Sequence, residues 1–133
     1  MSSPRRKDPD YTLNIFHHTD EETNVRGILF LVQTTKIFVS FRYEILLQDE
    51  VSPGVIRLRI LGLHTPELLM PQTGPARGSR FYPGLEGRFR VQVTKHDKAA
   101  AEFDLHAGAD LLHIHAAPKN SFILVSNEPV FVE

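Results

Sequence analysis

Alternating apolar and polar residues predict β-strands along almost the whole chain, and no segment has the period of a long helix. The clearest run covers residues 36–48, where the alternation has the two-residue period of a strand that buries one face. We expect a single strand there, with one row facing the core: Ile37, Val39, Phe41, Tyr43, Ile45 and Leu47.

The segments on either side of this run predict further strands. Residues 1–10 are polar and contain proline, which favours a disordered tail, and a polar loop is expected over 17–24. Residues 25–32 include a continuous apolar run, typical of a strand covered on both faces. Two more strands are expected over 11–16 and 55–63, with a turn at 49–54 before the second. Their inward rows would be Tyr11, Leu13, Ile15, Ile56, Leu58 and Ile60.

Residues 64–87 predict a long irregular loop, because four prolines and four glycines interrupt every period. Aromatic residues and methionine are enriched in interface cores, so this loop is a candidate docking arm for a partner. The expected partner-binding residues are Leu68, Leu69, Met70, Phe81 and Tyr82. The alternative is a loop that folds onto its own domain and covers the same side chains.

The C-terminal part predicts a meander of β-hairpins whose registers follow from the apolar pattern. Residues opposite each other in an antiparallel pair share a face, so buried residues must meet buried residues. A three-residue loop at 96–98 satisfies this rule and places Arg90 opposite Asp104 and Gln92 opposite Glu102.

Two further hairpins are expected after residue 106. A loop at 107–110 would place Asp104 opposite His113 and Glu102 opposite His115. A turn at 118–120 would then bring Phe122 against Ala116 and Leu124 against Ile114. A short last strand is expected over 130–132.

These elements predict an all-β fold, an antiparallel β-sandwich of about eight or nine strands with a C-terminal β-meander. A closed β-barrel is the alternative. Residues 11–133 are expected to form a single domain, since 133 residues fit one core.

Composition narrows the classes of function. The chain has no cysteine, which excludes a disulfide framework, a thiolate nucleophile and a cysteine-based zinc site. The net charge of −1 disfavours nucleic acid as a partner. No signal peptide or membrane-spanning apolar run is evident, so we expect a soluble, cytoplasmic protein.

The predicted rows of the meander suggest a metal site. Imidazole and carboxylate groups are ligands for zinc, iron and manganese, and several would lie on one surface. The candidates are Glu102, Asp104, His106, His113 and His115. The alternative is a set of ordinary cross-strand pairs on a solvated face, and a cation at Arg90 would repel a metal ion.

Six arginines suggest an anion site beside the predicted loop, because guanidinium groups bind carboxylate and phosphate with two parallel hydrogen bonds. They are Arg57, Arg59, Arg77, Arg80, Arg88 and Arg90. The alternative is an arginine-rich outer face without a ligand.

From these features we expect a non-catalytic interaction or binding module without a cofactor. It would use the 64–87 loop or a sheet edge to contact a protein partner or a second copy of itself. A small-molecule-binding β-barrel and a metal-dependent enzyme built on the His and carboxylate rows stay open as alternatives, although the sequence shows no catalytic signature motif.

Overall fold

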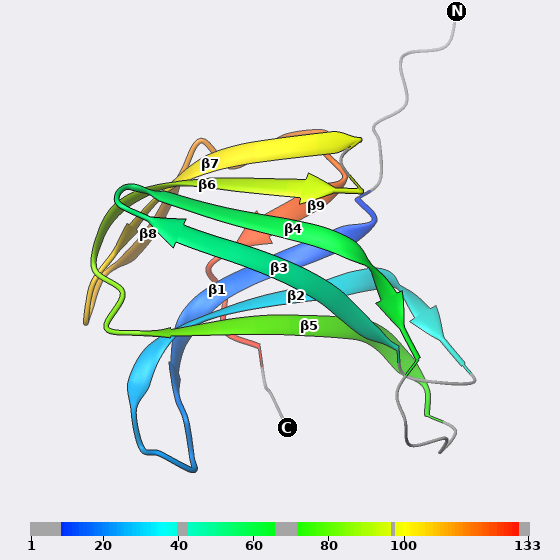
Figure 1. Ribbon diagram of the computed structural model, residues 1–133, viewed down its shortest axis with the longest axis horizontal. Helices are drawn as coiled ribbons and strands as arrows, with labels where there is room; N and C mark the ends of the chain where they lie inside the picture. Colours follow the sequence, from blue (N-terminus) through cyan, green and yellow to red (C-terminus); the bar gives the residue numbers. More distant parts are fainter. Residues whose placement is uncertain (1–8, 40–42, 66–71, 97, 131–133) are drawn as a thin grey trace, which may run out of the picture.

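Nine β-strands form most of the described part of the chain, which comprises residues 9–39, 43–65, 72–96 and 98–130 of this computed structural model (Figure 1). They are β1 (Tyr11–Thr19), β2 (Arg26–Phe38), β3 (Glu44–Ser52), β4 (Val55–His64), β5 (Gly74–Pro83), β6 (Gly87–Lys95), β7 (Ala99–Ala107), β8 (Leu112–His115) and β9 (Ile123–Ser126). These residues include no helix, and so none with the length and apolar character that crossing a membrane requires.

The strands form one mixed sheet in the order β8-β7-β6-β4-β3-β5-β2-β1-β9. The predicted all-β class and the number of strands are confirmed. Three neighbouring pairs are parallel, namely β4/β6, β1/β9 and β3/β5, so the sheet is not wholly antiparallel. The sheet curls until it is nearly closed and barrel-like (Figure 1). Its edge strands are linked by Asn127, whose side-chain amide donates to the carbonyl oxygen of Leu112 over 3.2 Å.

The core lies inside the curled sheet. Apolar side chains from strands on opposite sides of this interior fill it. Phe30 of β2 and Phe103 of β7 are among the largest fully buried residues. The predicted buried rows of β1 and β4 are confirmed, because Tyr11, Leu13, Ile15, Ile56, Leu58 and Ile60 all belong to this core.

A second, smaller cluster lies outside the sheet. The apolar run in β2 is buried on both faces, as the sequence predicts. Leu29 and Leu31 on its outer side pack with Phe16 of β1, and Phe81 and Val130 cover them. The segment after β9 therefore shields the outer face of β2. The same segment is bound to β1, because the side-chain amide of Asn14 donates to the backbone carbonyl of Glu128.

β3 and β5 are neighbours, yet in the described part of the chain their register pairs only Glu44 with Arg77. Beyond this pair the two strands diverge (Figure 1). Gly78 permits the close approach at the junction, because a Cβ there would lie 2.6 Å from the carbonyl oxygen of Ile45. We call this region the β3/β5 junction.

Side chains bridge the junction where the backbones separate. Arg80 donates from Nε to Asp49 Oδ1 (2.9 Å) and from Nη2 to the carbonyl oxygen of Leu47 (2.6 Å). The Tyr82 hydroxyl donates to Asp49 Oδ2 over 2.6 Å. Burial, together with this hydrogen bond, raises the pKa of Tyr82 well above its usual range. Burial also acts to raise the pKa of Asp49, but the bonds from Tyr82 and Arg80 outweigh it and lower that pKa.

The predicted single strand over 36–48 is wrong. β2 ends at Phe38 and β3 begins at Glu44, and β5 lies between them in the sheet. Ile45 and Leu47 are buried as expected, but Ile37 and Val39 are 54% and 75% exposed. Alternation reports which face a residue prefers and does not report where the chain leaves the sheet. Phe41 lies outside the described residues.

The predicted loop over 64–87 is also wrong, because β5 occupies its second half and lies in the middle of the sheet. Pro75 and Pro83 lie near the ends of the strand, where proline is tolerated, and Gly78 serves the close approach to β3. Phe81 and Tyr82 are therefore strand residues. Leu68, Leu69 and Met70 lie outside the described residues.

The later hairpins differ from their predicted pairings. β8 is shifted by two residues, so that His106 meets His113 and Asp104 meets His115. β9 pairs in parallel with β1 and not with β8, so the pairings expected for Phe122 and Leu124 are wrong. The expected last strand falls largely on residues 131–133, which lie outside the described residues.

Replacing Gly78 with alanine tests the close approach at the junction. We expect Gly78→Ala to lower the free energy of unfolding by about 1–3 kcal/mol, because a backbone oxygen cannot move aside as a flexible side chain can. Urea unfolding followed by circular dichroism measures the change. Gly108→Ala is the matched control, since its Cβ would meet Leu111 at an ordinary 3.6 Å. Equal losses in both variants would show that the contact with Ile45 is not the reason for glycine.

Acid titration tests the role of Asp49. Because its folded pKa is lowered, its contribution is present above the unfolded pKa of about 4 and is lost as the pH falls through the folded value. We expect Asp49→Asn to lower the free energy of unfolding by about 1–2 kcal/mol at pH 7, with a difference from wild type that shrinks on acidification. The exposed Asp110→Asn is the control. A difference that stays constant with pH would contradict the assignment.

Candidate functional site

The outer face of β3, β4, β6 and β7 carries polar side chains in rows that cross the strands. One row places Glu50, Arg57, Gln92 and Glu102 side by side on four successive strands. The sequence neighbours of Arg57, Gln92 and Glu102 fill the core, so alternation along β4, β6 and β7 sends these three side chains outward. The face is therefore set by the same pattern that builds the core.

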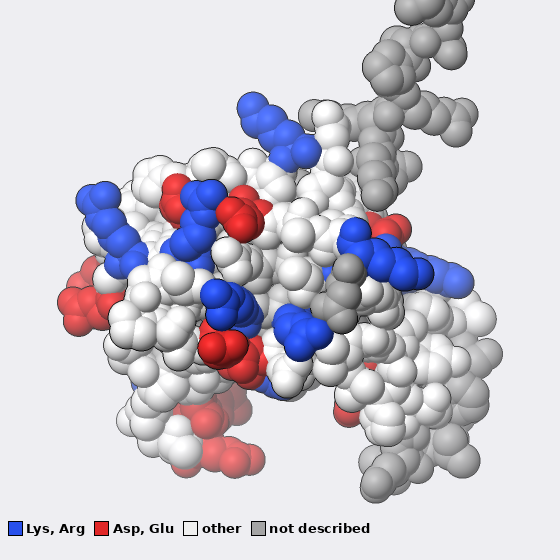
Figure 2. All heavy atoms as spheres, turned by 45° about the horizontal axis from the view of Figure 1, so that its top comes forward, with Lys and Arg blue, Asp and Glu red and all other residues white. Residues whose placement is uncertain are grey.

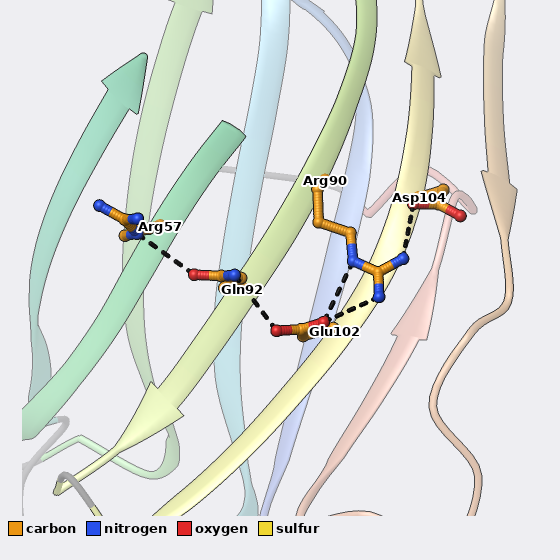
Figure 3. Close-up of polar contacts among 5 residues, drawn as sticks. All are labelled: Arg57, Arg90, Gln92, Glu102 and Asp104. Carbon is orange, nitrogen blue, oxygen red and sulfur yellow. Dashed lines mark hydrogen bonds and ion pairs between the residues drawn. The ribbon is translucent and has the colours of Figure 1, made fainter. Parts of the chain in front are cut away.

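Arg90 is the centre of a hydrogen-bonded network on this face (Figure 3). It donates from Nε and Nη2 to Glu102 Oε2 (3.1 and 2.9 Å) and from Nη1 to Asp104 Oδ1 (3.1 Å). The hydrogen bonds that Arg90 donates to Asp104 and to Glu102 raise the pKa of Arg90. Gln92 continues the network by donating to Glu102 and accepting from Arg57. The cross-strand pairs predicted for Arg90 and Gln92 are thus confirmed.

The six candidate arginines do not converge on one site. Arg59 and Arg77 donate to the side-chain oxygens of Gln48 and Gln33, and Arg80 lies at the β3/β5 junction. Arg57 forms an ion pair with Glu50, with Nη1 3.8 Å from Oε1. Arg88 differs from these, because its side chain is exposed and makes no hydrogen bond or ion pair with any other described residue.

The shift of β8 changes the neighbours of the histidines. Arg88 of β6 lies opposite His106 of β7, which in turn lies opposite His113 of β8. We call these three residues the donor row. His115 lies in the next row, with its ring centroid 6.1 Å from that of His113. Within the described ranges, no three His, Asp or Glu side chains are grouped so that they could hold a metal ion.

A hollow of about 450 Å³ lies on the same face, within the size range of ligand pockets. Its polar lining comes from Arg88, Arg90, Asp104, His106 and His115. The side chains of Arg90 and Asp104 are bound to each other, whereas those of Arg88 and His106 form no hydrogen bond with another described residue. Figure 2, in which the top of Figure 1 comes forward, shows positive and negative side chains interspersed on this side.

The barrel interior offers less room for a ligand. A pocket at one end of the barrel holds about 180 Å³ and is lined by the turns after β5 and β7. His17 lies in its wall with Nε2 2.7 Å from the carbonyl oxygen of Gly108. Beyond this mouth the space between the strands is occupied by core side chains such as Phe30 and Ile28.

Sequence reasoning assigned Arg88 to the anion set and His106 to the metal set without pairing them. The signal was present, because the register that sets Arg90 opposite Asp104 also sets Arg88 opposite His106. The position of His113 in the same row could not be found in this way, since it depends on the loop between β7 and β8.

Comparisons with known proteins assign no family to this chain. No protein-family model matches it, and searches of curated proteins and of solved structures find no similar protein. The candidate site therefore stands on its geometry.

Proposed function

We propose that the chain is a non-catalytic binding module that takes an anionic group of its ligand in the hollow between β6, β7 and β8. The observation that carries the proposal is the pair Arg88 and His106. Their side chains are adjacent donors beside a hollow of about 450 Å³, and neither side chain forms a hydrogen bond with another described residue.

The chemistry of the donors selects the class of ligand. A guanidinium group has five N–H donors in a fork that matches phosphate or carboxylate oxygens, and it accepts no hydrogen bond. A neutral imidazole still donates one N–H. An anion in the hollow would satisfy both groups at once, whereas a cationic ligand would meet Arg88 without a counter-charge.

Charge balance indicates modest affinity. Arg88 and Arg90 line the hollow with Asp104, and Glu102 binds Arg90 beside it, so the formal charges of these four side chains cancel. Attraction then rests on directed hydrogen bonds, and binding should weaken in salt because the groups are exposed. Asp104 lines the hollow and opposes an anion, which makes it a useful position for a test.

Two earlier alternatives have less support than this site. Phe81 and Tyr82 belong to β5, so they are not available as anchors of a docking arm over 64–87. The interior of the barrel is filled by core side chains and leaves little room for a large ligand. Phe30, Phe103 and Leu13 are almost fully inaccessible to solvent there. Contact with a second copy through a sheet edge stays a separate hypothesis, which light scattering would test.

Titration with inorganic phosphate at low ionic strength tests the proposal. We expect amide chemical shifts of β6, β7 and β8 to move in nuclear magnetic resonance spectra. Arg88→Ala should weaken binding about tenfold through the lost charge-assisted bonds. Asp104→Asn should strengthen it about two- to threefold by removing a repelling carboxylate.

Arg57→Ala is the matched control, because it removes the same charge from the same face outside the hollow. Its phosphate affinity should equal that of wild type. An Arg88→Ala variant that binds phosphate as well as wild type does would refute the proposed site.

A further inference from the structure

The three members of the donor row lie on a line that crosses the strands. Arg88, His106 and His113 occupy directly opposite positions on β6, β7 and β8. Neighbouring strands lie about 4.7–4.9 Å apart, so the row extends over about 10 Å from the first backbone to the third. Each of the three has an N–H donor that forms no hydrogen bond with another described residue.

The row extends one strand beyond the two donors that line the hollow. A phosphate held by Arg88 and His106 leaves the donor of His113, one strand further on, for a second anionic group. A ligand that satisfies all three donors carries anionic oxygens along a line across the sheet. His113 is the member that decides this, because it lies at the β8 end of the row and does not line the hollow itself.

The direction of the row disfavours an acidic peptide. A peptide strand added at β8 would run along the strands, and its side chains would meet successive rows and not one row. Its acidic residues on one face would also lie about 6.6–6.8 Å apart, which does not match the strand spacing. Phosphoryl groups joined by bridging oxygens present acceptors at closer intervals and can lie across β6, β7 and β8.

The neighbouring row confines the ligand to this line. Arg90 is held by Glu102 and Asp104, so its guanidinium is already bound on both sides. The carboxylates repel a polyanion that moves from the donor row toward Arg90. The charged network in Figure 3 therefore bounds the donor row on one side, because Arg88, His106 and His113 occupy the register positions next to the row of Arg90 and Asp104.

We infer that the donor row binds an oligophosphate chain laid across β6, β7 and β8, with Arg88 and His106 holding one phosphoryl group and His113 a later one. This inference rests on the proposed function and adds the class of ligand. It makes His113 a determinant of ligand length, since a single phosphate does not need it.

Isothermal titration with phosphate, pyrophosphate and triphosphate at matched ionic strength tests the inference. We expect affinity to rise about tenfold from phosphate to triphosphate, the gain of one further charge-assisted bond. His113→Ala should abolish this gain and leave phosphate affinity unchanged. His113→Gln should restore part of it, because its amide donates a hydrogen bond.

His64→Ala is the control, since His64 is an exposed histidine of β4 that does not line the hollow. Thermal unfolding of each variant verifies that the fold is kept. Citrate binding as tightly as triphosphate would overturn the preference for phosphoryl groups. Equal affinity for phosphate and triphosphate, with both lost in Arg88→Ala, would refute the oligophosphate and leave the proposed function intact. Absence of binding by any of these anions would refute both.

Discussion

The continuity of the single curled sheet depends on the junction between β3 and β5. Every other neighbouring pair in the sheet is joined by a ladder of at least four residue pairs, but among the described residues this register joins only Glu44 and Arg77. The backbone N–H of Arg77 also donates to the carbonyl oxygen of Tyr43 over 3.3 Å. Further along, Asp49, Arg80 and Tyr82 supply side-chain contacts, and Arg80 binds the backbone carbonyl of Leu47. Side chains thus replace the missing ladder and hold two curved parts of the sheet around one core.

Placement of the polar face follows from the curling of the sheet. Because one side of each strand fills the interior, the alternate residues of β3, β4, β6, β7 and β8 form a continuous outer surface. Opposite charges on adjacent strands then bind each other, as Arg90 does with Glu102 and Asp104. The neutral side chain of Gln92 links this network to Arg57. The donor row stands out because its cross-strand neighbours are a guanidinium and two imidazoles, which offer each other no carboxylate.

The hairpin of β6 and β7 was predictable in detail, and with it half of the candidate site. Its three-residue loop leaves one register in which Val91 meets Phe103, so Arg90 must meet Asp104. The next hairpin was not predictable to the same degree. A shift of two residues keeps every side chain on its face, so burial does not distinguish Asp104 opposite His113 from Asp104 opposite His115.

The sequence by itself determined that this protein is built of β-strands, which faces of β1, β4, β6 and β7 are buried, and that Arg, Asp, Glu and His side chains share an outer surface. Only the tertiary structure decided that β5 enters the middle of the sheet, that β9 joins β1, and that His113 aligns with Arg88 and His106. The physical reason is that alternation is a local property of each strand. Parallel pairing between strands far apart in the chain, such as β4 with β6, depends on how the strands close around a shared core.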